Sequence, residues 1–143
     1  MNTPRVFVNP SDVRAKWNSS ASTIPFGSAV VQGIGDDSVE IAVSELDVVI
    51  GLLANRDLPR SGSKVGGDYQ DIQLRGVAVG IAGTGGVNAG ARLTVDSTKP
   101  GALVEARPAH GVTVALVGLA NRSAAEGELF EVELSGPGAS VTG

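Results

Sequence analysis

The sequence predicts an all-β protein, a small β-barrel or sandwich built from two related β units and preceded by an extended N-terminal arm. Three observations support this. A Gly-Leu-Ala-Asn-Arg pattern occurs twice, as GLLANR at residues 51–56 and GLANR at 118–122, each time after an apolar run and before an alternating segment. From residue 26 on, apolar and polar residues alternate with a period of two, as in half-buried strands. The 20 glycines among 143 residues provide for many tight turns.

The first element, residues 1–24, differs in composition from the rest and is predicted to be an arm. It is rich in Asn, Ser and Pro, contains the only Trp, and carries a net charge of +2, whereas residues 25–143 carry −6. Ser11 or Asp12 could cap one short helical turn that runs through Trp17. The alternatives for this segment are a disordered tail and an arm that becomes ordered on a partner.

Residues 25–143 are predicted to form the barrel or sandwich domain. Alternation predicts strands in which one face is apolar, and the clearest examples are Val39, Ile41 and Val43; Leu93 and Val95; and Phe130, Val132 and Leu134. The glutamates that alternate with the last group, together with Glu126 and Glu128, indicate the wet face of an edge strand in preference to a partner site. Two units of this kind could close around a single small core.

Two runs, residues 47–53 and 112–119, are apolar on both faces, as expected of a central strand or of one covered by a neighbouring subunit. Between the two repeats, residues 58–69 contain Pro59, Gly62, Gly66 and Gly67 among mixed charges. This composition predicts a mobile loop.

Several classes of function find little support in the residues. There is no cysteine and a single histidine, His110, so the usual zinc ligand sets cannot be built, and no cofactor is expected. The net charge of −4 disfavours general nucleic-acid binding. No apolar segment is long enough to span a bilayer, so no membrane partner is expected. No set of acid, base and nucleophile is evident, and we therefore expect a protein that is not an enzyme.

The second half of the chain resembles the small capsid cement, or head-decoration, proteins of tailed bacteriophages. The resemblance is carried by residues 89–96 (AGARLTVD), 101–106 (GALVEA), 117–120 (VGLA) and 126–134 (EGELFEVEL), with residues 72–77 also fitting the pattern. It implies a β-barrel-like protein, often a homotrimer, that sits on the outer surface of a phage head and clamps neighbouring subunits of the major capsid protein. The implied location is the virion, after synthesis in the host cytoplasm.

On this reading, two sets of residues receive a role as hypotheses. The arm would contact the capsid through Arg5, Phe7, Arg14, Lys16 and Trp17. The two apolar runs would supply the core and a subunit interface through Val49, Leu52, Val114 and Leu116.

A carbohydrate-binding or adhesion module on a virion or cell surface is the alternative function. Such modules usually stack sugar rings on aromatic side chains. The candidates here are Trp17 and Tyr69, which are both expected outside the strands. The scarcity of aromatic residues, 3% of the chain, argues against this alternative.

Overall fold

The structure, a computed structural model, describes residues 13–59 and 69–143, and every regular element in these residues is a β-strand. Five strands form a closed barrel in the order β1-β3-β2-β4-β5. They are β1 (Val13–Asn18), β2 (Ala29–Gln32), β3 (Ser38–Ile41), β4 (Gly51–Leu53) and β5 (Tyr69–Gln73). Strand β1 closes this first barrel, because it pairs antiparallel with β5 and parallel with β3.

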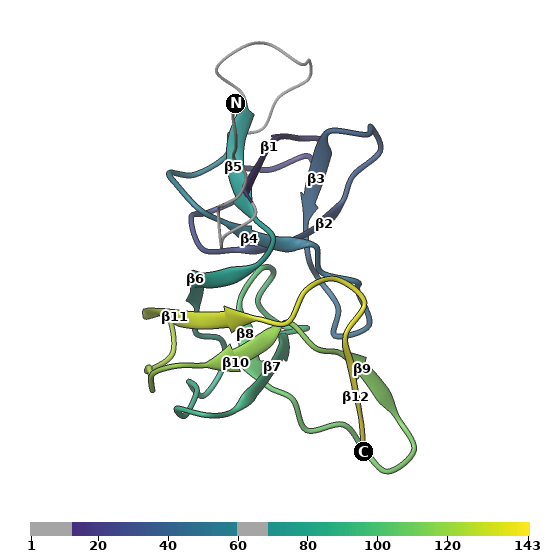
Figure 1. The fold of residues 1–143 in the computed structure, drawn as a ribbon, viewed down its shortest axis with the longest axis vertical. Helices are drawn as coiled ribbons and strands as arrows, with labels where there is room; N and C mark the ends of the chain where they lie inside the picture. Colours follow the sequence, from purple (N-terminus) through teal and green to yellow (C-terminus); the bar gives the residue numbers. More distant parts are fainter. Residues whose placement is uncertain (1–12, 60–68) are drawn as a thin grey trace, which may run out of the picture.

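Five further strands form a second sheet in the order β6-β11-β10-β7-β8. They are β6 (Gly76–Ile81), β7 (Arg92–Val95), β8 (Leu103–Glu105), β10 (Gly118–Ala120) and β11 (Leu129–Leu134). The two outer strands meet at a parallel bridge between Ala82 and Leu103, where the N–H of Gly83 donates to the carbonyl oxygen of Leu103 at 2.7 Å. The sheet therefore curls into a second barrel, which lies below the first along the long axis of the molecule (Figure 1).

The two barrels have the same strand order and the same register. Strands β1 to β5 correspond to β6, β7, β8, β10 and β11. In the first barrel, Val30 lies opposite Ile41 on one side and Gly51 on the other. In the second barrel, Leu93 takes the place of Val30, with Glu105 and Gly118 opposite. The GLLANR and GLANR repeats thus mark β4 and β10, and the prediction of an all-β fold from two related units is confirmed.

Each barrel has its own interior, so the expectation of a single shared core is wrong. Six residues fill the first barrel: Ile24, Val30, Val39, Leu53, Leu58 and Ile72. The equivalent positions of the second barrel hold Val87, Leu93, Leu103, Ala120, Ala124 and Val132, which belong to or pack against the second core cluster. Small aliphatic residues fill both interiors because a five-stranded barrel leaves little room for side chains.

The second cluster also extends across the junction between the barrels. It includes Ala29, Ala42, Val49 and Leu52 from the first barrel, all buried. Backbone hydrogen bonds reinforce the contact, since Gly101 accepts from the N–H of Ala29 at 2.9 Å and donates to Ala42 at 2.8 Å. The barrels are therefore packed together through the β2–β4 face of the first.

A separate two-stranded sheet lies beside the second barrel (Figure 1). It pairs β9 (Thr113–Ala115) with β12 (Ser140–Thr142). The run 112–119, predicted to be continuous, is therefore divided between β9 and β10. The division places Val114 in one sheet and Val117 beside the other, and both are buried.

The predicted arm ends earlier in the chain than residue 24. Residues 13–18 form a barrel strand, with Val13 opposite Gln73 and Trp17 opposite Tyr69, so no helical turn runs through Trp17. Pairing on both sides of the strand outweighs the local capping signal, because most of the stability of a short element comes from tertiary contacts. Residues 1–12 of the predicted arm lie outside the described residues.

The predicted 58–69 loop is shorter at both of its ends. Leu58 is fully buried and forms a bridge with Ile24, and Tyr69 begins β5. The intervening residues 60–68 are outside the described part of the chain.

Candidate functional site

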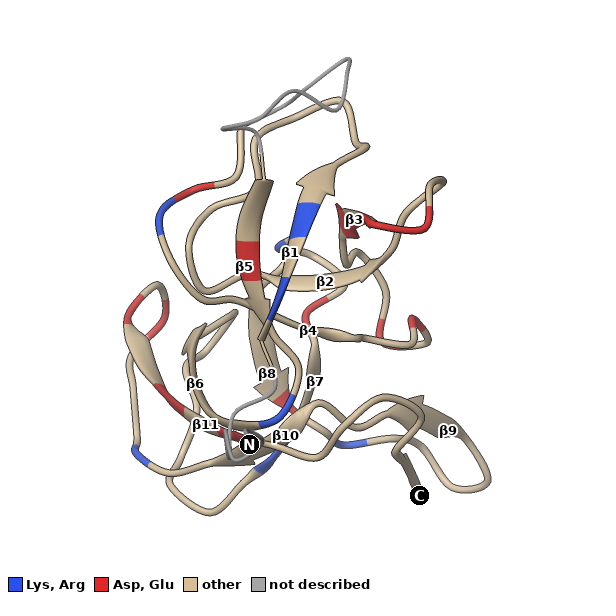
Figure 2. Ribbon diagram, turned by 45° about the horizontal axis from the view of Figure 1, so that its top comes forward, with Lys and Arg blue, Asp and Glu red and all other residues tan. Residues whose placement is uncertain are grey.

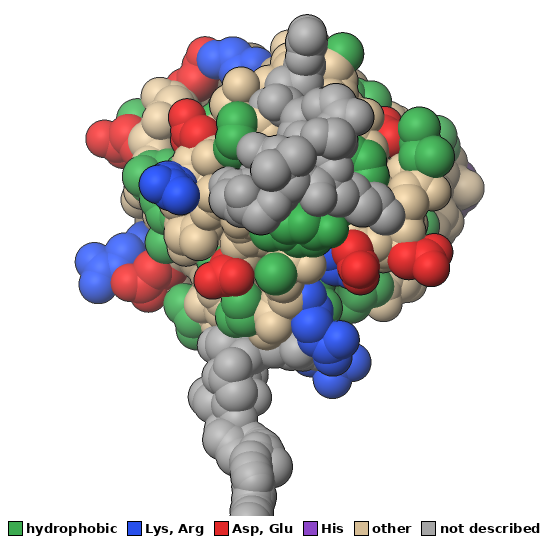
Figure 3. Space-filling view, turned by 90° about the horizontal axis from the view of Figure 1, so that it is seen from above, with side chains coloured by type: hydrophobic (Ala, Val, Ile, Leu, Met, Phe, Trp, Pro, Cys, Tyr) green, Lys and Arg blue, Asp and Glu red, His purple; other side chains and the backbone are tan. Residues whose placement is uncertain are grey.

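The residues assigned to capsid contact fall into two groups. Arg5 and Phe7 precede the described residues. Arg14, Lys16 and Trp17 lie on β1, where Arg14 is exposed and the other two are half-buried. The basic pair is visible along β1 in Figure 2. Figure 3 shows the molecule from the end of the first barrel, where acidic, basic and apolar side chains are intermixed on the surface.

Of the residues assigned to a subunit interface, Leu52 is placed in the interior. Its side chain is fully buried by its own chain, at the junction of the two barrels, so the interface role predicted for it is wrong. The other three, Val49, Val114 and Leu116, come from distant parts of the sequence and line one groove. Val49 and Val114 are buried, whereas Leu116 is half-buried.

This apolar groove has a volume of about 160 Å³. It lies between the loop 46–49 of the first barrel and the β9–β12 sheet, and its lining is completed by Gly138, Ala139 and Ser140. On the first-barrel side of the groove, Leu46 and Val48 are 65% and 57% exposed. Large apolar side chains at this level of exposure are typical of a contact surface when they gather at one place.

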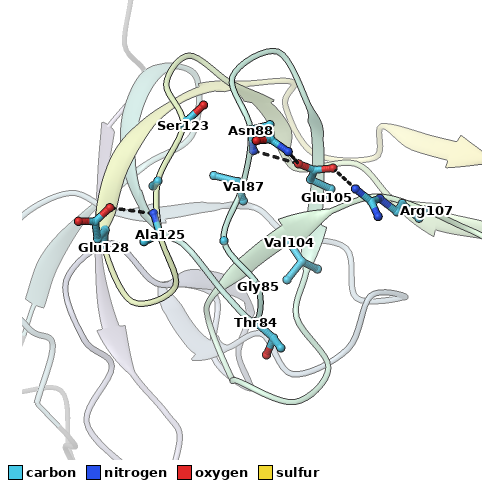
Figure 4. A pocket seen from close by; sticks show the side chains of 12 residues that line it. Thr84, Gly85, Val87, Asn88, Val104, Glu105, Arg107, Ser123, Ala125 and Glu128 are labelled. Atoms are coloured by element: carbon cyan, nitrogen blue, oxygen red, sulfur yellow. Dashed lines mark hydrogen bonds and ion pairs between the residues drawn. The ribbon is translucent and has the colours of Figure 1, made fainter.

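A second, larger hollow of about 520 Å³ lies on the second barrel (Figure 4). Three segments surround it: the loop 84–88 between β6 and β7, residues 104–107 at the end of β8, and the loop 123–128 between β10 and β11. Its charged and amide groups are Asn88, Glu105, Arg107 and Glu128. We call this site the polar hollow.

A hydrogen-bond chain at the rim holds Glu105 in place (Figure 4). Its Oε2 accepts from the backbone N–H and from Nδ2 of Asn88 at 2.9 and 2.8 Å, and its Oε1 accepts from Nη2 of Arg107 at 2.6 Å. The Arg107 side-chain hydrogen bond, followed by that of the Asn88 backbone, lowers the pKa of Glu105. The Glu105 side chain is only 17% exposed, whereas that of Arg107 is 78% exposed.

The opposite wall of the hollow is formed by a tight turn. Glu128 accepts the N–H of Ala125 at 2.8 Å through Oε1, and Ser123 accepts the N–H of Ala89 at 3.0 Å. Glu126 lies just outside the lining, where its carboxylate binds Lys99 and the N–H of Gly85. These contacts, with the Lys99 hydrogen bond first, lower the pKa of Glu126.

Sequence reasoning missed the polar hollow. It noted the glutamates from 126 to 133 but interpreted them as the wet face of an edge strand. Strand β11 is flanked by β6 and β10, so it is not an edge in this sheet. The residues that meet at the hollow are separated by up to about forty positions, and alternation within one strand carries no signal of such a meeting.

No group of three or more His, Asp or Glu side chains in residues 13–59 and 69–143 is arranged to hold a metal ion. In the same ranges there is also no helix with the length and apolar character needed to cross a membrane.

Comparison with known proteins gives a likeness of fold. No protein-family model matches the chain. No curated protein matches it. Among solved structures, the chain is similar to the head fiber gp8.5 N base of bacteriophage phi29, with a TM-score of 0.61 and 20% sequence identity. The match covers 87% of this chain and 94% of that chain, so it includes both barrels.

Proposed function

We propose that this protein is a structural component of a tailed-phage virion. The observation that carries the proposal is the likeness to a phage head-fibre base, which extends over 87% of this chain. The resemblance of residues 89–134 to capsid cement proteins supports the same assignment from the sequence.

Within the virion, we place the protein on the outer surface of the head, where it binds and bridges subunits of the major capsid protein. Contacts that form only on the assembled lattice stabilise that lattice, because binding to one state shifts the equilibrium towards it. Many identical copies then add their weak contacts. On this proposal, Arg14 and Lys16 of β1, together with Arg5 and Phe7 before it, face the capsid. Trp17 supports the strand from its half-buried position.

The protein would act as a homotrimer whose subunits meet at the apolar groove. The exposed side chains of Leu46 and Val48 supply apolar area at this place, and Leu116 continues it into the groove. Burying such area is the main favourable term in association.

Co-sedimentation with expanded phage shells that lack decoration tests capsid binding. The full chain should pellet only in the presence of shells. A variant without residues 2–12 should remain folded, because its truncation stops before β1, and should fail to pellet. A longer deletion through residue 20 is unsuitable, because it would remove a strand of the first barrel.

Charge variants separate capsid contact from general electrostatics. Lys16→Glu should weaken pelleting, whereas Arg122→Glu, on the second barrel, should not. Arg122 is a matched control because its side chain is 73% exposed and its ion pair with Glu131, at 3.5 Å, is a surface one. Absence of pelleting by the full chain with every shell would overturn the capsid-binding proposal.

A further inference from the structure

The polar hollow on the second barrel has no part in the proposed capsid contact, and its chemistry is different from that of the apolar groove. Three separate loops bring carboxylate, guanidinium, amide and hydroxyl groups to one concave surface. The hydrogen-bond chain from Asn88 through Glu105 to Arg107 holds the rim in a defined geometry before any ligand arrives. Preorganised polar groups of this kind reduce the entropy lost on binding.

The hydrogen-bonding groups of the hollow argue against an anionic ligand. Phosphate sites use free backbone N–H groups. Here the backbone N–H groups of the loop 85–89 already donate to other groups of the chain: Glu126, Gly83, Ala124, Glu105 and Ser123. Arg107 remains as a donor, but Glu105 takes up one of its nitrogens and Glu128 adds a negative charge nearby.

A large apolar or aromatic ligand fits no better. The apolar side chains in the lining of the hollow are the small ones of Val87, Val104, Ala124 and Ala125, and that of Val87 is almost fully buried. Its lining contains no aromatic side chain on which a flat ring could stack. A metal ion lacks the necessary set of ligands among the described residues.

A ligand rich in hydroxyl groups matches the hydrogen-bond donors and acceptors that the hollow still offers. Oε2 of Glu128 and the remaining acceptor position on Oε1 of Glu105 accept from hydroxyl groups. The hydroxyl of Ser123 and the guanidinium of Arg107 donate to ring or hydroxyl oxygens. The small apolar side chains of the lining suit the C–H face of a sugar ring. The volume, about 520 Å³, falls within the range of small-molecule sites.

We propose that the polar hollow is a binding site for a neutral oligosaccharide. The inference goes beyond the structural role proposed above and does not depend on it. Hydrogen bonds in place of ring stacking make a single site weak. Display of many copies on one particle would raise the overall strength through avidity.

The test is a nuclear magnetic resonance titration of the full, isotope-labelled chain with neutral di- and trisaccharides of glucose, galactose and N-acetylglucosamine. Glycerol, inorganic phosphate and a short lysine-rich peptide serve as comparison probes. At least one oligosaccharide should shift the backbone amides of residues 84–88, 104–107 and 123–128 in a saturable manner. Glycerol and phosphate should not shift them.

Matched variants identify the site. Arg107→Ala and Glu128→Gln should each weaken binding about tenfold, the effect expected on losing one charge-assisted hydrogen bond. Arg122→Ala and Glu131→Gln remove exposed charges that are not part of the lining of the hollow and should leave the affinity unchanged. The unperturbed spectrum of each variant reports that the barrel is still folded.

The proposal is overturned by any of three results: no saturable shift with any sugar, equal weakening by the control pair, or shifts produced by phosphate or by the peptide alone. None of these results bears on the shell-binding assay, which uses a different surface. A failure of sugar binding is therefore distinguishable from a failure of the virion role.

Discussion

Among single residues, Asp96 has the most hydrogen-bonded carboxylate in the described part of the chain. It is 5% exposed. Its Oδ2 accepts from the N–H and the hydroxyl of Thr84, both at 2.8 Å, and its Oδ1 accepts from the N–H and the hydroxyl of Thr98 at 2.9 and 2.8 Å. Burial alone would raise the pKa of Asp96, but these four bonds outweigh it and lower the pKa to about 2.

The linkage between this pKa and folding gives a pH dependence. Because the folded-state pKa is below the unfolded one, Asp96 contributes stability that is fully present above about pH 4 and is lost as the pH falls towards 2. The contribution is about 2 kcal/mol at neutral pH. We expect Asp96→Asn to lower the free energy of unfolding by about this amount and to flatten its decline between pH 4 and 2. Urea unfolding at several pH values measures both.

Asp71→Asn is the control for this change. Asp71 is exposed on β5, and its substitution should alter stability by less than about 0.5 kcal/mol. An Asp96→Asn protein with the same acid profile as the unchanged chain would contradict the role given to the four hydrogen bonds.

At the level of the strand, the repeated glycine explains why the sequence pattern occurs twice. Gly51 begins β4 and Gly118 begins β10. A Cβ atom at Gly51 would overlap the carbonyl oxygen of Gln73, and one at Gly118 would overlap that of Glu133, which is the equivalent residue on β11. The glycines therefore allow two strands to approach more closely than any side chain would permit.

Gly118→Ala should consequently destabilise the protein by about 3 kcal/mol or more, because backbone must move to accommodate the methyl group. Thermal unfolding followed by circular dichroism measures the loss. Gly127→Ala is the comparison: this residue has φ of +85° but nothing within 4 Å of an added Cβ, so it should cost only about 1–2 kcal/mol. A smaller loss at Gly118 than at Gly127 would show that the close approach is not what requires glycine.

The strands differ in how well they can be predicted from the sequence. Alternation identified β11, where Phe130 and Val132 are buried between exposed glutamates, and β7, where Leu93 and Val95 are buried. It did not identify β1, because this strand has an exposed start and is specified by pairing with β5, more than fifty residues away. Local patterns predict strands that have one apolar and one polar face. They do not predict strands whose place is determined by pairing with distant residues.

Two equivalent leucines of the repeat show this limit of local sequence patterns clearly. Leu52 and Leu119 hold equivalent places in β4 and β10, yet Leu52 is fully buried and Leu119 is 42% exposed. The difference arises because the second barrel covers the first at this face. No local property of the sequence distinguishes these two leucines. The burial of Leu52, which rules out the predicted interface role, becomes evident only from the packing of one barrel on the other. The polar hollow could not be predicted either, because it is formed by three loops that only the tertiary structure brings together.

At the scale of the whole molecule, the apolar groove gives a test of association. Leu46→Ser combined with Val48→Ser removes exposed apolar area. We expect this double change to convert the proposed trimer into monomers, while the unfolding temperature of the monomer stays within about 2 °C. Sedimentation equilibrium measures the mass. Ile34→Ser is the control, because Ile34 is 89% exposed and is not part of the groove.

If the unchanged chain is a monomer at all concentrations, or if the double variant keeps the mass of the oligomer, the groove is not the subunit interface. The trimer proposal would then have to rest on another surface. Shell binding by β1 and the preceding residues would be unaffected by either result.

The packing of the two barrels also makes the halves of the chain unequal as independent proteins. The face of the first barrel that meets the second is formed by Ala29, Ala42, Val49 and Leu52, whereas the second barrel carries Arg92, Ala106, Leu116 and Leu119 at the corresponding places. A fragment that contains only the first half would expose these apolar side chains to water, and we expect it to aggregate. The equivalent face of the second barrel carries the guanidinium of Arg92 and is already partly exposed to water in the intact chain, so it does not depend on the first barrel for cover.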